Sequence, residues 1–334
     1  FLELFFFLTL REIANIPWWE FFPLEKVFLY VFFFTAFISL FTGVIFTLGL
    51  VWAKQKERTD STLISACYIV EALGSFCAGS LVTILFLHLS PPLVILFWGA
   101  VFFSLFALGT IALFRDTRAF LLHIAFVIIL LALVPSLTHM VSLFQQRRLA
   151  SILPGARLKE EVYTPYQHIL IGERAAHIIV ISNGGVVTSF PEVIDAEKDG
   201  SLILAEAEEA RRIVIFGYGA ENLICALLRF PLTHISYVVE DTVYFEHVSR
   251  RLPHEMKRAF IDGRLRVTHA SPRAFLARTQ QQRPDEKFDL AVILVPDPST
   301  LLLNSFFTEE FYALVQKNLT ERGIIATRIR SAEN

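Results

Sequence analysis

A glycine turn and the acidic residue that follows it are the features of this chain most able to do chemistry. The run Ile213–Asn222 is apolar at first and then carries Gly217 and Gly219, a spacing typical of the tight turn between a strand and a helix in a nucleotide-binding sheet. Glu240 follows about twenty residues later, where an acid can accept hydrogen bonds from ribose hydroxyls. Such residues also occur at ordinary turns and strand ends, so a nucleoside site and a structural turn both stay open.

Asp297 is a second candidate for a functional acid. It stands between Pro296 and Pro298, directly after an apolar run, at the edge where open parallel sheets place their active sites. The carboxylate could be catalytic or could bind substrate, but a Pro-Asp-Pro turn whose acid bonds to local amides has the same sequence. The histidines are scattered, and no cysteine or histidine cluster has zinc spacing. We therefore expect no metal site.

Glu71 lies inside a long apolar stretch, where a buried carboxyl group is costly. Helical spacing places it on one face with Gly74 and Ala78, and small residues favour close helix contacts. The acid is either a proton or ion site or a protonated group that fixes helix packing, and the lack of a second acid in these stretches favours packing. His123 and His139 are too far apart to form an i,i+4 pair, so we expect bundle contacts from both.

The composition is too apolar for one soluble globule. Of the 334 residues, 54% are hydrophobic and 33 are phenylalanine, and the mean hydropathy is +0.54. The net charge of −2 gives no sign of nucleic-acid binding, and three cysteines do not make a disulfide framework. The apolar excess lies in the N-terminal part of the chain.

Apolar segments long enough to cross a bilayer predict a helical membrane domain over residues 1–148. We interpret Phe1–Leu10 as the tail of a truncated span. The complete spans are expected at Val27–Ala53, Leu63–Leu89, Leu93–Phe114 and Ala119–Phe144. Basic residues flanking the spans favour, by a margin of one charge, a non-cytoplasmic location for the remainder of the chain. The expected location is a bacterial-type inner membrane.

The composition changes near Leu149 and predicts two further regions. Residues 149–200 are expected to form short strands with a hairpin at Asn183–Gly185, followed by a polar linker at Asp195–Gly200. In residues 201–334, which we expect to be incomplete at the C-terminus, apolar strands alternate with helical stretches. These strands are Arg212–Phe216, Ile235–Glu240, Leu265–Thr268, Phe288–Val295 and Gly323–Ile329. The predicted fold class is a multi-pass α-helical membrane domain followed by α/β, with a small β-hairpin region and a doubly wound, Rossmann-like (methyltransferase-like) parallel sheet.

The order of several motifs resembles the spermidine synthases, and in particular their membrane-embedded relatives, which fuse a transmembrane bundle to a synthase-like domain. The matching motifs in the apolar part are Gly43–Phe46, Tyr68–Gly74 and Ala78–Gly79. Those in the second part are Thr164–Gln167, Asn183–Gly184, Val238–Glu240, Pro296–Pro298 and Phe311–Tyr312. The resemblance implies transfer of an aminopropyl group from decarboxylated S-adenosylmethionine to putrescine. It also implies donor contacts from Gln167, Gly217, Gly219 and Glu240.

The chain departs from this family at the acids that the chemistry needs. Tyr218 and Ala220 interrupt the glycine-rich turn. Ser271 aligns with the acid that holds the adenine amine, and Leu294 aligns with the catalytic acid. The family's Tyr-His-Glu segment after the hairpin has no counterpart in Pro191–Gly200. Leucine cannot accept a proton, and losing a general base typically costs about 10² to 10⁴ in rate.

From these departures we expect a degenerate domain in a non-catalytic structural or interaction subunit of a membrane complex. Such a protein would need no cofactor, and its partners would be the lipid bilayer and other proteins. One alternative is a transferase that uses S-adenosylmethionine or its decarboxylated form, such as an aminopropyltransferase, with Asp297 or Glu240 at its site. A second alternative is a transporter that uses Glu71.

Overall fold

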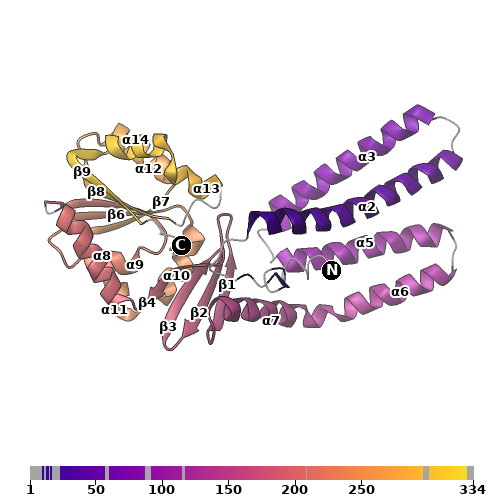
Figure 1. Ribbon diagram of the computed structural model, residues 1–334, viewed down its shortest axis with the longest axis horizontal. Helices are drawn as coiled ribbons and strands as arrows, with labels where there is room; N and C mark the ends of the chain where they lie inside the picture. Colours follow the sequence, from indigo (N-terminus) through magenta and orange to yellow (C-terminus); the bar gives the residue numbers. More distant parts are fainter. Residues whose placement is uncertain are drawn as a thin grey trace. The chain divides into compact units, whose positions relative to one another are not determined.

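The computed structural model describes residues 10, 13–14, 16, 23–56, 60–86, 92–114, 117–207, 209–295 and 301–328. The chain divides into two compact units, Phe1–Ile152 and Leu153–Asn334. The first unit is helical and the second combines helices with two sheets (Figure 1).

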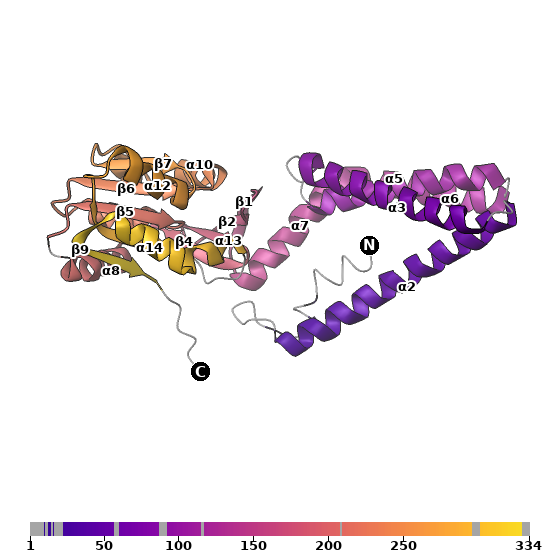
Figure 2. The ribbon, with the colours of Figure 1, turned by 90° about the horizontal axis from the view of Figure 1, so that it is seen from above.

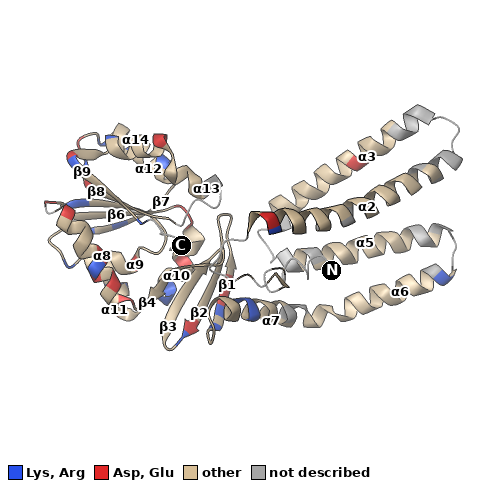
Figure 3. Cartoon of the chain, viewed as in Figure 1, with Lys and Arg blue, Asp and Glu red and all other residues tan. Residues whose placement is uncertain are grey.

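The first unit consists of long apolar helices. They are α2 (Leu24–Lys56), α3 (Asp60–Leu81) continued by a π-helical turn (Val82–Phe86), α5 (Pro92–Phe114), α6 (Thr117–Ala132) and α7 (Val134–Ile152). Charged residues are sparse along α2, α3, α5 and α6 (Figure 3). Many large apolar side chains on these helices are exposed, such as Phe102 at 75% and Phe106 at 68%. His123 on α6 contacts the backbone oxygen of Ser104 on α5 at 3.0 Å, a helix-to-helix contact of the expected kind.

Among the described residues, one helix, Ser65–Ile84, has the length and hydropathy to cross a bilayer. A second span is present if the bent pair of helices Phe120–Ser136 and Val141–Ile152 is taken together as a single span. The bent pair corrects the expected span Ala119–Phe144. The chain turns by 60° between Phe120–Ser136 and Val141–Ile152. Pro135 lies one residue before the end of the first piece, and a proline inside a helix removes a backbone hydrogen bond and kinks the chain.

The second unit opens with a four-stranded antiparallel sheet in the order β1-β2-β3-β4. Its strands are β1 (Arg157–Tyr163), β2 (His168–Arg174), β3 (His177–Ser182) and β4 (Gly185–Phe190). The predicted hairpin joins β3 to β4, where Asn183 and Gly184 have φ of 49° and 90°. Two positive φ values are the geometry of the two-residue turn that Asn-Gly favours. The short strands and the hairpin turn predicted for this region are both present, and the strands form one four-stranded sheet.

A five-stranded sheet follows, and all its strands are parallel. Its strands are β5 (Arg212–Gly217), β6 (His234–Val239), β7 (Leu265–His269), β8 (Phe288–Leu294) and β9 (Leu319–Thr327), in the order β7-β6-β5-β8-β9. The predicted Rossmann-like parallel sheet is confirmed. The strands run side by side in two perpendicular views (Figures 1 and 2). The last strand begins earlier than predicted, because Leu319 already pairs with Phe288 before an irregularity in the ladder.

Helices cover both faces of this sheet, because its central strands are apolar on both sides. Ile213 and Ile215 of β5 pack into a core with α9 (Glu221–Leu227), α10 (Thr242–Arg251) and α11 (His254–Ala259). Val214 and Phe216, which alternate with them, face a second core with α12 (Pro272–Gln282) and α14 (Glu309–Lys317). Two short helices, α13 (Leu301–Asn304) and a 3₁₀ turn (Ser305–Phe307), precede α14.

The predicted polar linker Asp195–Gly200 is wrong, since these residues belong to α8 (Val193–Glu206). Ala196 and Gly200 are its buried residues, and a Cβ atom added to Gly200 would be in ordinary contact with Ala226 and Leu223 of α9. These two small residues, four positions apart, let α8 pack closely on α9. The acids around them lie on the remaining face of the helix, so a charged sequence here marks an amphipathic helix and not a loop.

Candidate functional site

The glycine turn lies at the carboxyl end of β5, the central strand. Gly217 and Gly219 have φ of 112° and 77°, a region that side chains with a Cβ atom rarely adopt. A Cβ atom on Gly217 would lie 1.9 Å from the carbonyl oxygen of Leu294, and one on Gly219 would lie 2.8 Å from Val187 Cγ1. Tyr218 donates its backbone N–H to the Leu294 oxygen at 2.9 Å. The sequence prediction of a tight turn from strand to helix is therefore confirmed, and neighbouring backbone explains both glycines.

Asp241, the residue after Glu240, joins the two sheets of the second unit. Its buried carboxylate accepts hydrogen bonds from the Thr164 hydroxyl at 2.7 Å, from Gln167 Nε2 at 2.9 Å and from the Tyr244 backbone N–H at 3.0 Å. The Gln167 side-chain oxygen accepts in turn from the Ser182 hydroxyl at 2.6 Å. Gln167, which the resemblance assigns to the donor, thus already bonds to the protein through both ends of its amide.

Glu240 follows β6 at the carboxyl edge of the sheet, beside the glycine turn's strand. Its side chain is half-buried, and its pKa is raised, first by burial and then by the neighbouring charge of Asp241. The pKa of Tyr166 is also raised, by burial and then by Glu240 and Asp241, which places this phenol close to both acids. Among the described residues no side chain or backbone group forms a hydrogen bond or ion pair with the Glu240 carboxylate. Its carboxylate oxygens can therefore accept hydrogen bonds from a ligand.

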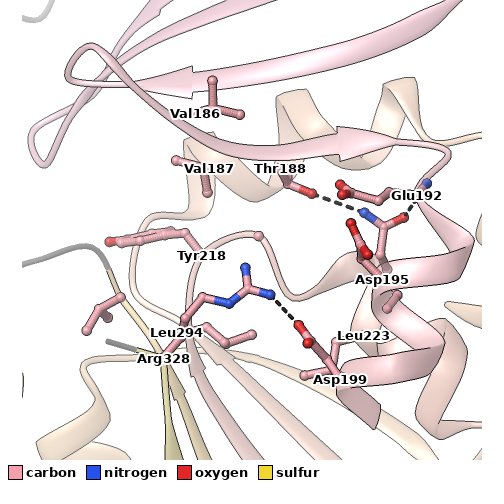
Figure 4. Close-up of a pocket in the computed structure, with 14 residues that line it drawn as sticks. Val186, Val187, Thr188, Glu192, Asp195, Asp199, Tyr218, Leu223, Leu294 and Arg328 are labelled. Carbon is pink, nitrogen blue, oxygen red and sulfur yellow. Dashed lines mark hydrogen bonds and ion pairs between the residues drawn. The ribbon is translucent and has the colours of Figure 1, made fainter. Parts of the chain in front are cut away.

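A pocket of about 150 Å³ opens beside the glycine turn. Its walls come from β4, the first turns of α8, the glycine turn and the ends of β8 and β9, with Tyr218, Gly219 and Leu294 on the strand side (Figure 4). Three carboxylates line the opposite wall: Glu192, Asp195 and Asp199. The pocket thus combines a bare backbone turn with a negatively charged helix face.

The three carboxylates differ in their partners. Glu192 accepts a hydrogen bond from the Ser189 hydroxyl at 2.7 Å, and Asp199 forms an ion pair with Arg328 at the end of β9. Asp195 is exposed and makes no hydrogen bond or ion pair with any described residue. It is therefore the acid of this pocket best able to receive a cationic ligand.

Sequence reasoning missed this acidic wall, although a signal was present. The three acids are spaced by three and four residues, which places them on one face of a helix. The segment was predicted to be a polar linker because charged residues are frequent in it, but it forms helix α8. A fully buried acid, Glu221 of α9, was missed as well.

The other residues that the sequence singled out lie in different parts of the structure. Leu294 ends β8 and lines the pocket, and Ser271 precedes the first turn of α12, where its side chain makes no capping hydrogen bond. Glu71 is exposed on α3, and a Cβ atom on Gly74 of the same face would meet open space. Asp297 lies outside the described residues. In the described part of the chain, no group of three His, Cys, Asp or Glu side chains could hold a metal ion.

The fold and the site together define the class of this domain. It is a parallel α/β domain with a glycine turn at its central strand and acids at the carboxyl edge. Residues 200–333 match the family model of the spermine/spermidine synthase domain. This part of the chain is spermidine synthase-like, which confirms the resemblance to that extent.

The curated relatives that the chain resembles are named polyamine aminopropyltransferases. The chain is 24% identical over 184 residues to polyamine aminopropyltransferase 2 of Ralstonia nicotianae, covering 53% of this chain and 34% of the relative. It is 25% identical over 272 residues to polyamine aminopropyltransferase 2 of Aquifex aeolicus, covering 79% of this chain and 52% of the relative. The chain thus spans about a third of the length of the first of these curated relatives and about half of the length of the second.

A crystal structure of spermidine synthase in complex with the transition-state analogue AdoDATO aligns with a TM-score of 0.45 at 20% identity, over 51% of this chain and 57% of that one. The prediction of a non-catalytic structural subunit is contradicted by the family match and the named relatives. Both favour the alternative, an aminopropyltransferase. The prediction rested on the acids missing at the positions of Ser271 and Leu294, whereas the pocket that Leu294 lines is also lined by Asp195 and Asp199 of α8.

Proposed function

We propose that the second unit is an aminopropyltransferase that joins an aminopropyl group from decarboxylated S-adenosylmethionine to an amine. The observation that carries this proposal is the pocket in which Gly219 and Tyr218 of the glycine turn face Asp195 of α8. The synthase-like match of residues 200–333 and the names of the relatives support it.

The donor is assigned to the edge formed by β5 and β6. Glu240 presents a half-buried carboxylate without a partner among the described residues, as an acceptor for two ribose hydroxyls requires. The bare backbone of Gly217 and Gly219 lets the nucleoside approach the sheet. Gln167 supports this edge indirectly, because it holds the Asp241 carboxylate next to Glu240.

The amine is assigned to the acidic pocket. Asp195 and Asp199 attract an ammonium group, and Asp195, which has no partner in the described structure, takes its proton. The freed nitrogen attacks the carbon next to the sulfonium; a C–N bond forms, the C–S bond breaks and the thioether leaves with the electron pair. Leu294 contributes an apolar wall here, so the acid expected at the end of β8 is replaced by acids of α8.

The test is turnover by the full chain purified in detergent, with decarboxylated S-adenosylmethionine and a series of diamines and polyamines. Mass spectrometry would detect the thioether and the extended amine. We expect Asp195→Asn to lower kcat by about 10² to 10⁴, because the group that takes the amine's proton is lost, and to raise KM for the amine about tenfold, because one charge-assisted hydrogen bond is lost. Glu197→Gln is the matched control, since Glu197 lies on the same helix but pairs with Arg229 outside the pocket. Folded protein that forms no product with any amine would overturn the proposal.

We also propose that the helices of the first unit anchor this enzyme in a lipid bilayer. Large exposed apolar side chains on α2, α3 and α5 support this, because water would solvate such surfaces poorly. The Aquifex aeolicus match covers 79% of the chain, more than the second unit contains, so the likeness extends into these helices. Carbonate extraction of membranes tests the proposal: the chain should stay in the pellet, and its release into the supernatant would contradict anchoring.

A further inference from the structure

Glu221, the first residue of α9, is fully buried directly behind the glycine turn. Its Oε1 atom accepts hydrogen bonds from the hydroxyls of Tyr237 and Tyr244, each at 3.4 Å. Its other oxygen, Oε2, has no hydrogen-bond partner among the described residues. A buried carboxyl group with one unsatisfied oxygen is costly, and packing alone gives no reason for an acid at this position.

Tyr244 connects this acid to the turn. Its phenolic oxygen accepts the backbone N–H of Gly219 at 3.0 Å while its O–H donates to Glu221. Its ring packs edge-on against that of Tyr218, with the centroids 5.1 Å apart. Glu221 therefore fixes the direction of the Tyr244 hydroxyl, and that hydroxyl holds the middle of the glycine turn.

We propose that Glu221 is a positioning residue, which sets the conformation of the glycine turn through Tyr244 and thereby tunes donor binding. The link to donor binding rests on the proposed function; the link between Glu221 and the turn does not. The acid is not placed in contact with either substrate. It acts through one side chain on the backbone that receives the donor.

The surroundings of Glu221 make this coupling sensitive to pH. Burial raises the pKa of Glu221 to about 7, and a hydrogen bond from its own backbone together with those from Tyr237 and Tyr244 opposes this rise. The titratable groups that face it are Tyr237 from β6, Tyr244 from α10 and Cys225 from its own helix, and burial raises the pKa of each of them. These neighbours stay neutral near neutral pH. The ionised form of Glu221 holds both hydroxyls as donors, and protonation weakens that hold.

Hydrogen exchange of the full chain in detergent tests the proposal without any ligand. Peptides covering Gly217–Glu221 would be followed by mass spectrometry at pH 6 and pH 8, after correction for intrinsic exchange. We expect about fivefold to tenfold faster exchange of the Gly219 amide at pH 6 than at pH 8, and a pH-independent rate in Glu221→Gln. Tyr244→Phe should exchange fast at both pH values, and this variant keeps the test decisive if Glu221→Gln does not fold.

Calorimetry with decarboxylated S-adenosylmethionine separates this inference from the proposed function. Tighter donor binding at pH 8 than at pH 6, lost in Glu221→Gln, supports both. The exchange pattern without donor binding leaves the positioning role standing and overturns the proposed function. Two results would overturn the positioning role. One is exchange of the Gly219 amide in Glu221→Gln with the same pH dependence as in the wild type. The other is slow exchange of that amide in Tyr244→Phe.

Discussion

Gly217 pairs with Leu294 across the central strands β5 and β8, and no side chain fits between them. The Leu294 carbonyl oxygen occupies the space where a Cβ atom of residue 217 would be. This contact brings the end of β8 against the glycine turn and makes Leu294 part of the pocket wall. The glycine is therefore required by the fold itself, whatever ligand the turn receives.

Replacing Gly217 by alanine should destabilise the second unit by about 3 kcal/mol, because the substitution adds a backbone clash to a positive φ. Thermal unfolding of the full chain would measure the loss. Gly263→Ala is the matched control, since a Cβ atom there meets nothing within 4 Å. Equal melting temperatures for the two variants would refute this account of the turn.

The turn between β2 and β3 predicts a stabilising substitution. Ala175 and Ala176 have φ of 48° and 65°, and a residue with a Cβ atom is strained in this region by about 1 kcal/mol. Ala176→Gly should therefore raise the free energy of unfolding by about 1 kcal/mol. Ala277→Gly in the middle of α12 should lower it by about the same amount. A drop in stability for Ala176→Gly would show that the turn is not strained.

The stability of the second unit should fall as the pH rises past neutrality because of Glu221. The pKa of this carboxyl group is raised from 4.5 to about 7 by burial, so the native state binds its proton more tightly than the unfolded state does. Its contribution is therefore fully present below pH 4.5 and is lost as the pH rises through about 7. The loss amounts to about 3 kcal/mol. Denaturant titrations of wild type and Glu221→Gln from pH 5 to pH 8 would isolate this contribution as their difference, which should be constant if the account is wrong.

The second unit should lose stability when the Asp241 carboxylate loses its charge or one of its oxygen acceptors. In Asp241→Asn the new amide group faces the donors of Thr164 and Gln167, so we expect a loss of about 2 kcal/mol or more. Thr164→Val removes one donor and should cost less than half as much. Chemical denaturation would compare the free energy of unfolding of the two variants. An Asp241→Asn variant as stable as the wild type would show that the two sheets do not depend on this acid.

The parallel sheet could be predicted from sequence because its strands are short apolar runs between helical segments. Ile213–Phe216 is apolar on both faces, and such a run requires helices on both sides. The Asn183-Gly184 turn was predictable for a similar reason, since few residue pairs adopt its two positive φ values.

The site was harder to predict, because its residues are distant in sequence or lie in misassigned elements. Glu221 meets Tyr237 and Tyr244, which follow it by 16 and 23 positions, and no local pattern marks that contact. Asp195 was not predicted as a site residue because an acid-rich segment is typical of a solvated linker. Only the small residues Ala196 and Gly200, which form a packing face, indicate a helix here. A search for single aligned acids also overlooks a carboxylate that reaches the same pocket from another helix.

The strand order β7-β6-β5-β8-β9 has a consequence for how the chain is made. β5 is the first of these strands to be synthesised, yet one of its two neighbours, β8, follows only after β6, β7 and four helices. Until Leu290 has left the ribosome, Ile213 has no partner on that side and an apolar strand edge stays open. Parallel sheets assembled from distant segments fold slowly. Nascent chains that stall before β8 should therefore be prominent clients of chaperones, and the glycine turn should be among the last parts of the fold to close.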